Sequence, residues 1–199
     1  MLSTRFTQHS LVTEAHKTIQ STLSAKSITL DATMGNGHDT LFLARHSAKV
    51  YAFDIQQAAL DSTYQQLQKH HLADKVVLTH ESHEQLRQHI PVDEQMDVII
   101  FNLGYLPRGD TTIITKTQST LSALNQALDI LSPSGIISIV CYPGHAGGQE
   151  EMSAVTDWYH QLNSHQFAIT IIHSMQETAQ APRLFVIKAA QNFTNPEKP

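Results

Sequence analysis

The sequence predicts one α/β domain with a mostly parallel sheet of seven strands and helices on both faces. Short runs rich in β-branched and aromatic residues alternate with longer stretches in which apolar residues recur every three or four positions. This alternation is typical of strands joined by helical crossovers. The final two strands are joined by the polar residues 173–183, which show no helical pattern, so we expect an antiparallel hairpin to close the sheet.

The expected elements follow one another in a regular order. Leu11, Ala15, Ile19 and Leu23 recur at helical spacing, so a helix within about residues 10–25 should precede the sheet. The strands are expected at Ile28–Ala32, Lys49–Phe53, Lys75–Thr79, Met96–Phe101, Ile136–Cys141, Phe167–Ile172 and Leu184–Lys188. The helices are expected at about Asp39–His46, Gln56–His71, His83–His89, Thr117–Leu131 and Gln149–Asn163. Residues 1–190 should form a single domain and residues 191–199 a flexible tail.

The composition excludes several classes of protein. The 199 residues suffice for one domain with its own core, and the single cysteine, Cys141, excludes a disulfide framework and a multi-cysteine zinc site. No run approaches about 18 apolar residues and no signal peptide is recognisable, so we expect a cytoplasmic protein without a membrane partner. The net charge of -5 argues against nucleic-acid binding by the whole surface, although a local basic patch remains possible, and we expect no DNA partner. The thirteen histidines are scattered along the chain, so we expect no metal site.

The glycines indicate where a ligand would bind. Seven of the eight follow the first, fourth or fifth predicted strand. The carboxyl ends of parallel strands share one edge of a sheet, and open α/β sheets bind ligands at that edge. Glycine there lets the backbone pass close to a ligand. We therefore expect the site where these three loops meet.

The loop after the first strand predicts a cofactor site. It runs from Asp31 to Thr40 through two glycines into a helix, whose N-terminal N–H groups are free to bind a ligand. A dinucleotide loop requires a third glycine, and Thr40 stands at that position. Carboxylates would also repel a pyrophosphate, whereas they suit the ammonium and sulfonium of S-adenosylmethionine. The residues expected to hold this cofactor are Asp31, Thr33, Gly35, Asn36, Gly37, Asp39 and Thr40, although Asp31 could instead only cap the turn that follows it.

Two further loops complete the expected cofactor site. Asp54, with Ile55 and Gln56, follows the second strand, where a carboxylate can bind the ribose hydroxyls of the cofactor. A carboxylate at this position would suit the ribose of NAD equally well. Asp54 could instead be a helix N-cap. Glu81, Ser82 and His83 follow the third strand and are expected near the adenine. There Ser82 and Gln85 could instead form a capping box, and a metal site at His80, His83 and Glu84 lacks a partner cluster.

The loop after the fourth strand carries the expected chemistry. It reads Asn102-Leu103-Gly104-Tyr105-Leu-Pro, an amide and an aromatic ring on a rigid turn. The Asn102 oxygen can accept a hydrogen bond from an amine, and Tyr105 can stack on a base, so both are expected to position a substrate. Leu103 and Gly104 should also border the cofactor. The alternative is a purely structural turn.

Three segments together resemble a known family. They are Asp31-Ala-Thr-Met-Gly-Asn-Gly-His-Asp-Thr, Asn102-Leu-Gly-Tyr-Leu-Pro and Tyr142-Pro-Gly-His-Ala-Gly-Gly-Gln-Glu150. In this order they are similar to the YtqB-like proteins long labelled rRNA methylases, over about residues 10–188. These are class I, Rossmann-like, S-adenosylmethionine-dependent methyltransferases, and those now named MnmM methylate 5-aminomethyl-2-thiouridine at the tRNA wobble position. One departure is Thr33, which stands where many class I enzymes have the first glycine.

The resemblance implies the same reaction here, with S-adenosylmethionine as cofactor and a tRNA anticodon stem-loop as partner. A primary amine has a pKa near ~10, so most of it is protonated at neutral pH and cannot attack the methyl group. A group that receives the proton is therefore needed, and His145 is one candidate. His145 could instead bind a phosphate or cap a helix. Arg108, Lys116 and Arg183 are expected to contact RNA phosphates, and Tyr105 and Tyr142 to stack on bases.

Other functions remain open at this point. The methyl acceptor could be rRNA or a small-molecule amine, and the chain could bind S-adenosylmethionine without catalysis. The sequence does not distinguish a monomer from a homodimer.

Overall fold

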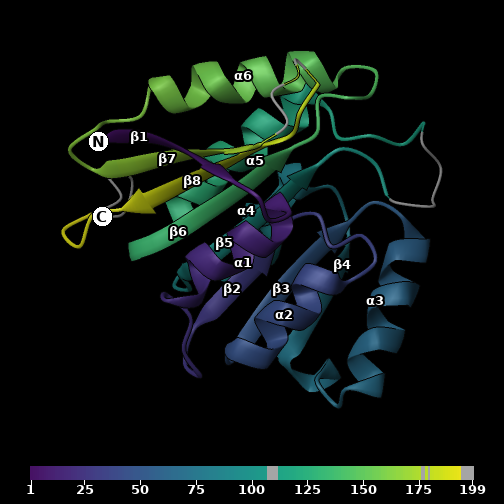
Figure 1. Ribbon diagram of the computed structural model, residues 1–199. Helices are drawn as coiled ribbons and strands as arrows, with labels where there is room; N and C mark the ends of the chain where they lie inside the picture. The colour runs from purple at the N-terminus through teal and green to yellow at the C-terminus, as the bar shows by residue number, and fades with distance from the viewer. Residues whose placement is uncertain (107–111, 176–177, 179, 194–199) are drawn as a thin grey trace.

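The structure is a computed structural model that describes residues 1–106, 112–175, 178 and 180–193. Its centre is one eight-stranded sheet, in the spatial order β1-β7-β8-β6-β5-β2-β3-β4 (Figure 1). The strands are β1 Leu2–Thr7, β2 Ile28–Asp31, β3 Lys49–Asp54, β4 Val76–His80, β5 Met96–Leu103, β6 Leu131–Cys141, β7 Phe167–Ser174 and β8 Arg183–Ala189. Strand β8 runs antiparallel to both of its neighbours, β6 and β7, and the other pairs are parallel. The predicted parallel sheet with a terminal antiparallel hairpin is therefore confirmed.

The prediction of seven strands was wrong by one, because β1 was not expected. Its sequence, LSTRFT, is polar, and five of its six residues are exposed. It lies at the edge of the sheet, parallel to β7, with Leu2 opposite Ile169. An edge strand held mainly by backbone hydrogen bonds to a distant strand has no alternating apolar pattern that a sequence could reveal.

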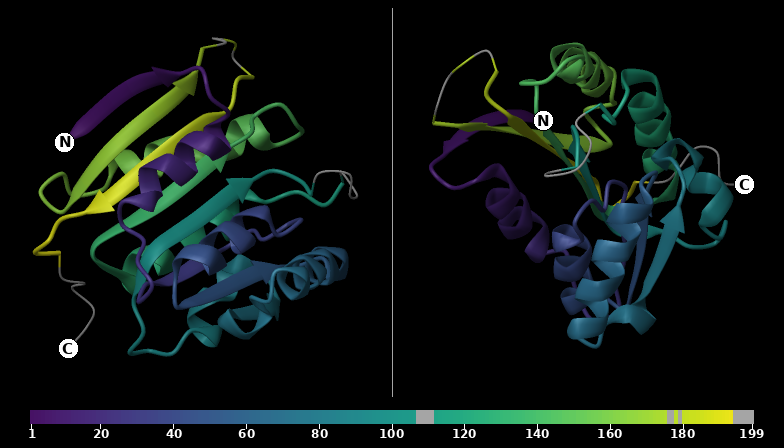
Figure 2. Two further views of the ribbon diagram at one scale, coloured as in Figure 1. Left: turned by 60° about the horizontal axis from the view of Figure 1, so that its bottom comes forward. Right: turned by 90° about the vertical axis from the view of Figure 1, so that its right-hand side faces the viewer.

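Helices cover both faces of the sheet (Figure 2). Helices α1, α2 and α3 pack on one face, and the 3₁₀ helix η2 with α4, α5 and α6 lies on the other. The helices are α1 Leu11–Gln20, α2 His38–His46, α3 Gln57–Lys69, η1 Ala73–Lys75, η2 His83–Gln85, α4 Leu86–His89, α5 Thr117–Ile130 and α6 Gly148–His160. All the predicted helices are present, although the one expected at His83–His89 divides into η2 and α4, and residue 131 belongs to β6 rather than to α5.

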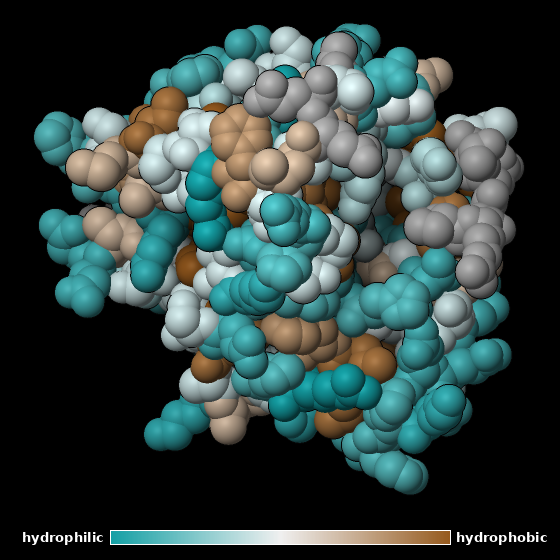
Figure 3. Space-filling model, in the orientation of Figure 1, coloured by the Kyte–Doolittle hydropathy of each residue, from teal (hydrophilic) through white to brown (hydrophobic). Residues whose placement is uncertain are grey.

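Two apolar layers hold the helices to the sheet, one on each face. Phe53, Phe101 and Phe185 are among the largest side chains of the layer beneath α5 and α6, and all three are buried. Ile19 and Leu43 belong to the opposite layer, beneath α1 and α2. The face shown in Figure 3 is mostly hydrophilic, with small separate apolar areas. Within the described ranges, none of the helices has the length and apolarity that a bilayer crossing requires.

The strand order creates a switch point between β2 and β5. From β2 the chain proceeds outward through β3 and β4, and from β5 it proceeds in the opposite direction to β6. The loops that follow β2 and β5 therefore diverge and leave a crevice at the carboxyl ends of these strands.

Candidate active site

A cavity of about 490 Å³ lies at the carboxyl ends of β2 to β5. Twelve of the residues predicted for the site line it: Thr33, Gly35, Asp54, Ile55, Gln56, Glu81, Ser82, His83, Asn102, Gly104, Tyr105 and Lys116. The remaining lining residues were not predicted: Ala32, Phe53, Glu84, Leu106, Ile113, Ile114, Thr115, Gln118 and Ser119. The three predicted cofactor loops thus meet at one cavity.

The loop after β2 curls tightly and is tied to the end of β3. Gly35 and Gly37 have φ angles of 50° and 80°, in the left-handed region. A Cβ at Gly37 would lie 2.7 Å from the hydroxyl oxygen of Thr63 on α3, so only glycine fits there. The Gly35 N–H donates to Asp54 Oδ2 at 3.0 Å. Loop and strand therefore form one rigid wall of the cavity.

Asp31 does not line the cavity. It is fully buried at the end of β2, where its carboxylate accepts hydrogen bonds from the Thr40 hydroxyl at 2.6 Å and the Thr33 N–H at 3.2 Å. Burial, followed by the charge of Asp39, raises the pKa of Asp31 to about 7. The Asp31 side chain therefore links the loop after β2, at Thr33, to the first turn of α2, at Thr40. Asn36, Gly37, Asp39 and Thr40 also lie outside the cavity lining.

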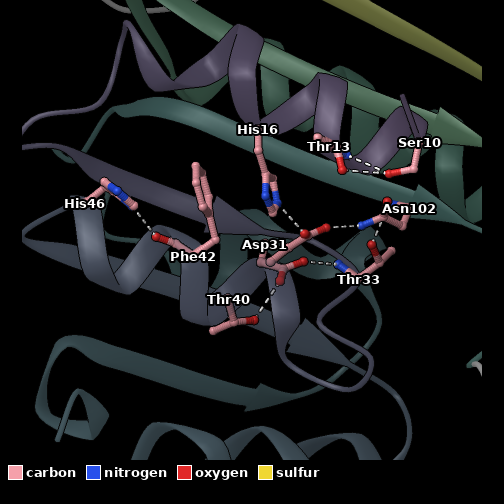
Figure 4. Close-up of polar contacts among 10 residues, drawn as sticks. Ser10, Thr13, His16, Asp31, Thr33, Thr40, Phe42, His46 and Asn102 are labelled. Atoms are coloured by element: carbon pink, nitrogen blue, oxygen red, sulfur yellow. Dashed lines mark hydrogen bonds and ion pairs between the residues drawn. The ribbon is translucent and has the colours of Figure 1, made fainter. Parts of the chain in front are cut away.

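Asn102 is held by an unexpected polar chain (Figure 4). Its side-chain nitrogen donates to Asp39 Oδ2 at 2.6 Å, and its backbone N–H donates to the Thr33 hydroxyl at 2.7 Å. The other Asp39 oxygen, Oδ1, lies 2.6 Å from Nε2 of His16, which comes from α1. The sequence singled out Asn102 and Asp39 but not His16, because nothing in the spacing of α1 places it beside α2.

The Asp54 carboxylate lies in the wall at the end of β3. It accepts hydrogen bonds from the Gln56 N–H at 2.9 Å as well as from Gly35, and burial raises its pKa. The predicted alternative of a helix N-cap is wrong in detail, since Gln56 is the capping position of α3. Asp54 instead fixes the two loops that border the cavity.

The segment after β4 combines a cap with a buried histidine. Ser82 caps η2 by accepting a hydrogen bond from the Glu84 N–H at 3.3 Å, and Glu81 accepts one from the Gln85 side chain. His83 is buried beside the cavity, its Nε2 has no hydrogen-bond partner, and burial lowers its pKa to about 4. His83 is therefore neutral at physiological pH. Within the described part of the chain, no three His, Cys, Asp or Glu side chains are grouped to bind a metal.

The loops after β5 and β6 pack against each other. The Tyr105 and His145 rings meet edge to face at a centroid distance of 6.0 Å, and the Tyr142 N–H donates to the carbonyl of Leu103. His145 Nδ1 lies 3.0 Å from the carbonyl of Ala146, and its buried Nε2 has no hydrogen-bond partner among the described residues. Tyr142 and His145 thus form a second row behind Gly104 and Tyr105, outside the cavity lining.

The predicted RNA contacts are only partly grouped. Lys116 lines the cavity and is exposed. Arg183 lies at the start of β8, opposite Cys141, and does not line the cavity. Arg108 lies outside the described residues. Tyr105 and Tyr142 are 45% and 38% exposed, which leaves part of each ring accessible.

The segment before α5 forms a wall of the cavity, and of its residues the sequence had indicated only Lys116. Thr115 lines the cavity, and its hydroxyl donates to buried Glu151 on α6 at 2.7 Å. The Thr120 hydroxyl donates to the other Glu151 oxygen at 2.6 Å. The wall is therefore fastened to α6 by a side chain that lies about 30 residues further along, which no local pattern indicates.

Comparisons with known proteins agree with this geometry. The family model described as "Putative rRNA methylase" matches residues 50–188. A chloroplastic tRNA (mnm(5)s(2)U34)-methyltransferase of Arabidopsis thaliana is 38% identical over 152 residues, which are 71% of this chain and 56% of that protein. The chain thus spans little more than half the length of this curated relative.

Solved structures show the same architecture. A protein of Clostridium thermocellum described as a "putative rRNA-methylase" is 32% identical, with a TM-score of 0.87, covering 92% of this chain and 99% of that one. A protein of Streptococcus mutans described as "a putative methyltransferase", solved in complex with SAH, is 32% identical with a TM-score of 0.84, covering 91% of this chain and 98% of that one. The chain therefore belongs to the family described as putative rRNA methylases, and its fold is that of Rossmann-like methyltransferases.

Proposed function

We propose that this chain transfers a methyl group from S-adenosylmethionine to the 5-aminomethyl group of (2-thio)uridine at the tRNA wobble position. The product is 5-methylaminomethyl-2-thiouridine. Membership of the methylase family and the 38% identity to a tRNA (mnm(5)s(2)U34)-methyltransferase support this reaction. The observation that carries it is the fixed amide of Asn102 at the cavity.

The cavity residues fit S-adenosylmethionine, which supplies an electrophilic methyl group when bound. Asp54 offers a carboxylate at the end of β3, where ribose hydroxyls can donate to it. Buried, neutral His83 offers Nε2, a polar atom without a partner, to a ligand such as adenine. Ile55 and Phe53 supply apolar walls. Asp31 would not contact the cofactor directly. It would instead hold the backbone of the loop after β2 in the conformation that binds the cofactor.

Asn102 can present its oxygen to an amine. An ionised carboxylate only accepts hydrogen bonds, so the amide nitrogen of Asn102 must face Asp39. Because Asp39 lies outside the cavity lining and Asn102 within it, the amide oxygen Oδ1 is the atom left for a substrate. It would accept one N–H of the aminomethyl group and hold the nitrogen lone pair in line with the methyl group.

His145 could receive the proton released by the amine. The Ala146 carbonyl can only accept a hydrogen bond, so Nδ1 of His145 is the protonated nitrogen and Nε2 is left as a base. Nε2 has no partner and lies near Gly104, with Tyr105 on the ring edge.

The RNA side of the site would be formed by aromatic rings and a few cations. The half-exposed rings of Tyr105 and Tyr142 can stack on splayed anticodon bases, as single-stranded RNA is usually bound. Lys116 at the cavity, with Arg108 and Arg183, would contact phosphates. With so few cations, we expect a modest dependence of binding on salt.

The direct test is incubation with labelled S-adenosylmethionine and two tRNA preparations, one unmodified and one carrying 5-aminomethyl-2-thiouridine. Nucleoside mass spectrometry should show one added methyl group on the aminomethylated nucleoside only. Asn102→Ala should abolish most of this product and leave cofactor binding measurable. Methylation of rRNA or of a small amine, with none on the aminomethylated tRNA, would refute the proposed substrate.

A further inference from the structure

We propose that His16 is a positioning residue for methyl transfer: it holds Asp39 in place, and Asp39 in turn orients the Asn102 amide. This role rests on the proposed function of Asn102 as the group that binds the substrate amine. His16 lies on α1, outside the three loops that form the cavity, and is not among the residues that line it.

The geometry leaves His16 little freedom. Its Nε2 lies 2.6 Å from Asp39 Oδ1, and its ring stacks on Phe42 with a centroid distance of 3.8 Å and an interplanar angle of 7° (Figure 4). Both neighbours belong to α2, so the histidine joins α1 to α2 beside the loop after β2. Because a carboxylate cannot donate, Nε2 carries the proton in this contact whether the ring is neutral or charged.

Asp39 needs such a partner. It is a buried carboxylate, only 8% exposed, and its charge acts on a second buried carboxylate, Asp31. Repulsion between the two carboxylates would favour displacement of Asp39. The N–H of His16 opposes this displacement, because it donates to Asp39 Oδ1 from a ring that is itself stacked on Phe42.

The consequence appears at Asn102. The fixed Asp39 carboxylate accepts a hydrogen bond from the amide nitrogen and so determines which end of the Asn102 side chain faces the cavity. If Asp39 were displaced, the amide could turn and direct its NH₂ group toward the substrate. Two donors would then face an amine whose lone pair must stay free for attack. His16 thereby acts on the reacting atoms through two hydrogen bonds.

Two substitutions separate the N–H of His16 from its packing. His16→Phe keeps a ring on Phe42 and removes the N–H, whereas His16→Gln places an amide N–H near the position of Nε2. The matched control is His46→Phe, since His46 also packs on Phe42, at 4.7 Å, and binds the Phe42 carbonyl at 2.8 Å without contacting Asp39.

Misplacement of a positioned group by about 1 Å can cost about 100-fold in rate, so we expect His16→Phe to lower kcat about 10- to 100-fold. KM for tRNA and Kd for S-adenosylmethionine should stay within about two-fold, since no binding contact is lost. His16→Gln should recover most of kcat, and His46→Phe should match the wild type. Wild-type kcat in His16→Phe, or equal losses in His16→Phe and His46→Phe, would overturn the proposal.

A second measurement does not depend on the substrate. The side-chain NH₂ resonances of Asn102, assigned by their loss in Asn102→Asp, should shift and exchange faster with solvent in His16→Phe but not in His46→Phe. Unchanged resonances would refute the positioning role. Absence of product from the wild-type protein on aminomethylated tRNA would refute the proposed reaction instead, and the two failures are therefore distinguishable.

Discussion

The side-chain nitrogen of Asn102 lies 2.6 Å from Asp39 Oδ2, and this bond joins the carboxyl end of β5 to the first turn of α2. The two residues are 63 positions apart in the sequence. They meet because β5 and β2 are neighbours at the centre of the sheet. The switch point therefore brings the predicted cofactor loop and the predicted substrate loop into contact.

Removal of the Asn102 amide should impair turnover more than binding. In Asn102→Ala no side-chain oxygen remains to orient the amine, and loss of one such preorganised contact lowers kcat by about 100- to 1,000-fold. Single-turnover assays on aminomethylated tRNA would measure this loss, with calorimetry to follow S-adenosylmethionine. A cofactor affinity that fell as far as kcat would contradict a role in substrate orientation.

Asp54→Asn should weaken cofactor binding. The Asn side chain retains one acceptor oxygen for the two backbone N–H groups of Gly35 and Gln56, and its NH₂ group cannot accept from ribose. We expect Kd for S-adenosylmethionine to rise about 10-fold or more, the size of one lost charge-assisted hydrogen bond. Calorimetry would compare it with Asp61→Asn, an exposed carboxylate on α3 that lies outside the cavity lining. Equal affinities in the two variants would exclude Asp54 from the cofactor site.

Gly37→Ala should destabilise the fold at the start of α2. The new Cβ would lie 2.7 Å from Thr63 Oγ1 and 2.9 Å from Thr63 Cα, and the φ of 80° is unfavourable for alanine. Backbone strain of this kind costs about 1–3 kcal/mol. Urea denaturation would measure the loss, with Gly144→Ala as the control, because a Cβ there meets nothing within 4 Å. A Gly37→Ala protein as stable as Gly144→Ala would show that the loop and α3 are not in close contact.

Asp31→Asn should change how stability depends on pH. The pKa of Asp31 is raised from 3.8 to about 7, so between these values the folded chain keeps a proton that the unfolded chain loses. The contribution of Asp31 to the free energy of unfolding therefore falls as the pH rises through this window and is constant above it. The neutral amide removes this loss. The free energy of unfolding of the variant should therefore rise relative to that of the wild type between pH 4 and pH 7, by up to a few kcal/mol. Urea denaturation at pH 5 and pH 8 would measure the free energy of unfolding, with Asp157→Asn, which changes an exposed carboxylate on α6, as the control. If the free energy of unfolding changed equally with pH in Asp31→Asn and in the wild type, Asp31 would be ionised throughout this range.

The sequence predicted the elements that bury an apolar face. Strands such as β5 contain a short apolar run, here residues 98–101, and α1 repeats its buried residues at helical spacing, so pattern alone located them. It failed at β1, whose exposed residues have no such pattern, and at the start of β6, where Ser132, Pro133 and Ser134 resemble a turn. Pairing with a neighbouring strand decides the structure of both segments.

The site was predictable where loop chemistry follows a strand. Glycines and carboxylates after β2 and β3, and the amide after β5, identified most of the polar lining. His16 and Glu151 were missed because each reaches its partner from a helix whose placement depends on the whole fold. The roles of Asp31 and Ser82 also needed the structure, which shows the hydrogen bonds that each makes within its own loop.

The place of β1 at the outer edge has a consequence for how the chain matures on the ribosome. The hydroxyl contact between Ser3 and Thr170 spans 167 residues, so β1 has no neighbouring strand until β7 has been synthesised. Helix α1, which carries His16, follows β1 directly and packs on β6, β7 and β8. The pairing of β1 with β7 is thus a late event in biogenesis. A nascent chain that stalls before β7 leaves β1 unpaired and α1 without its contacts to β7 and β8.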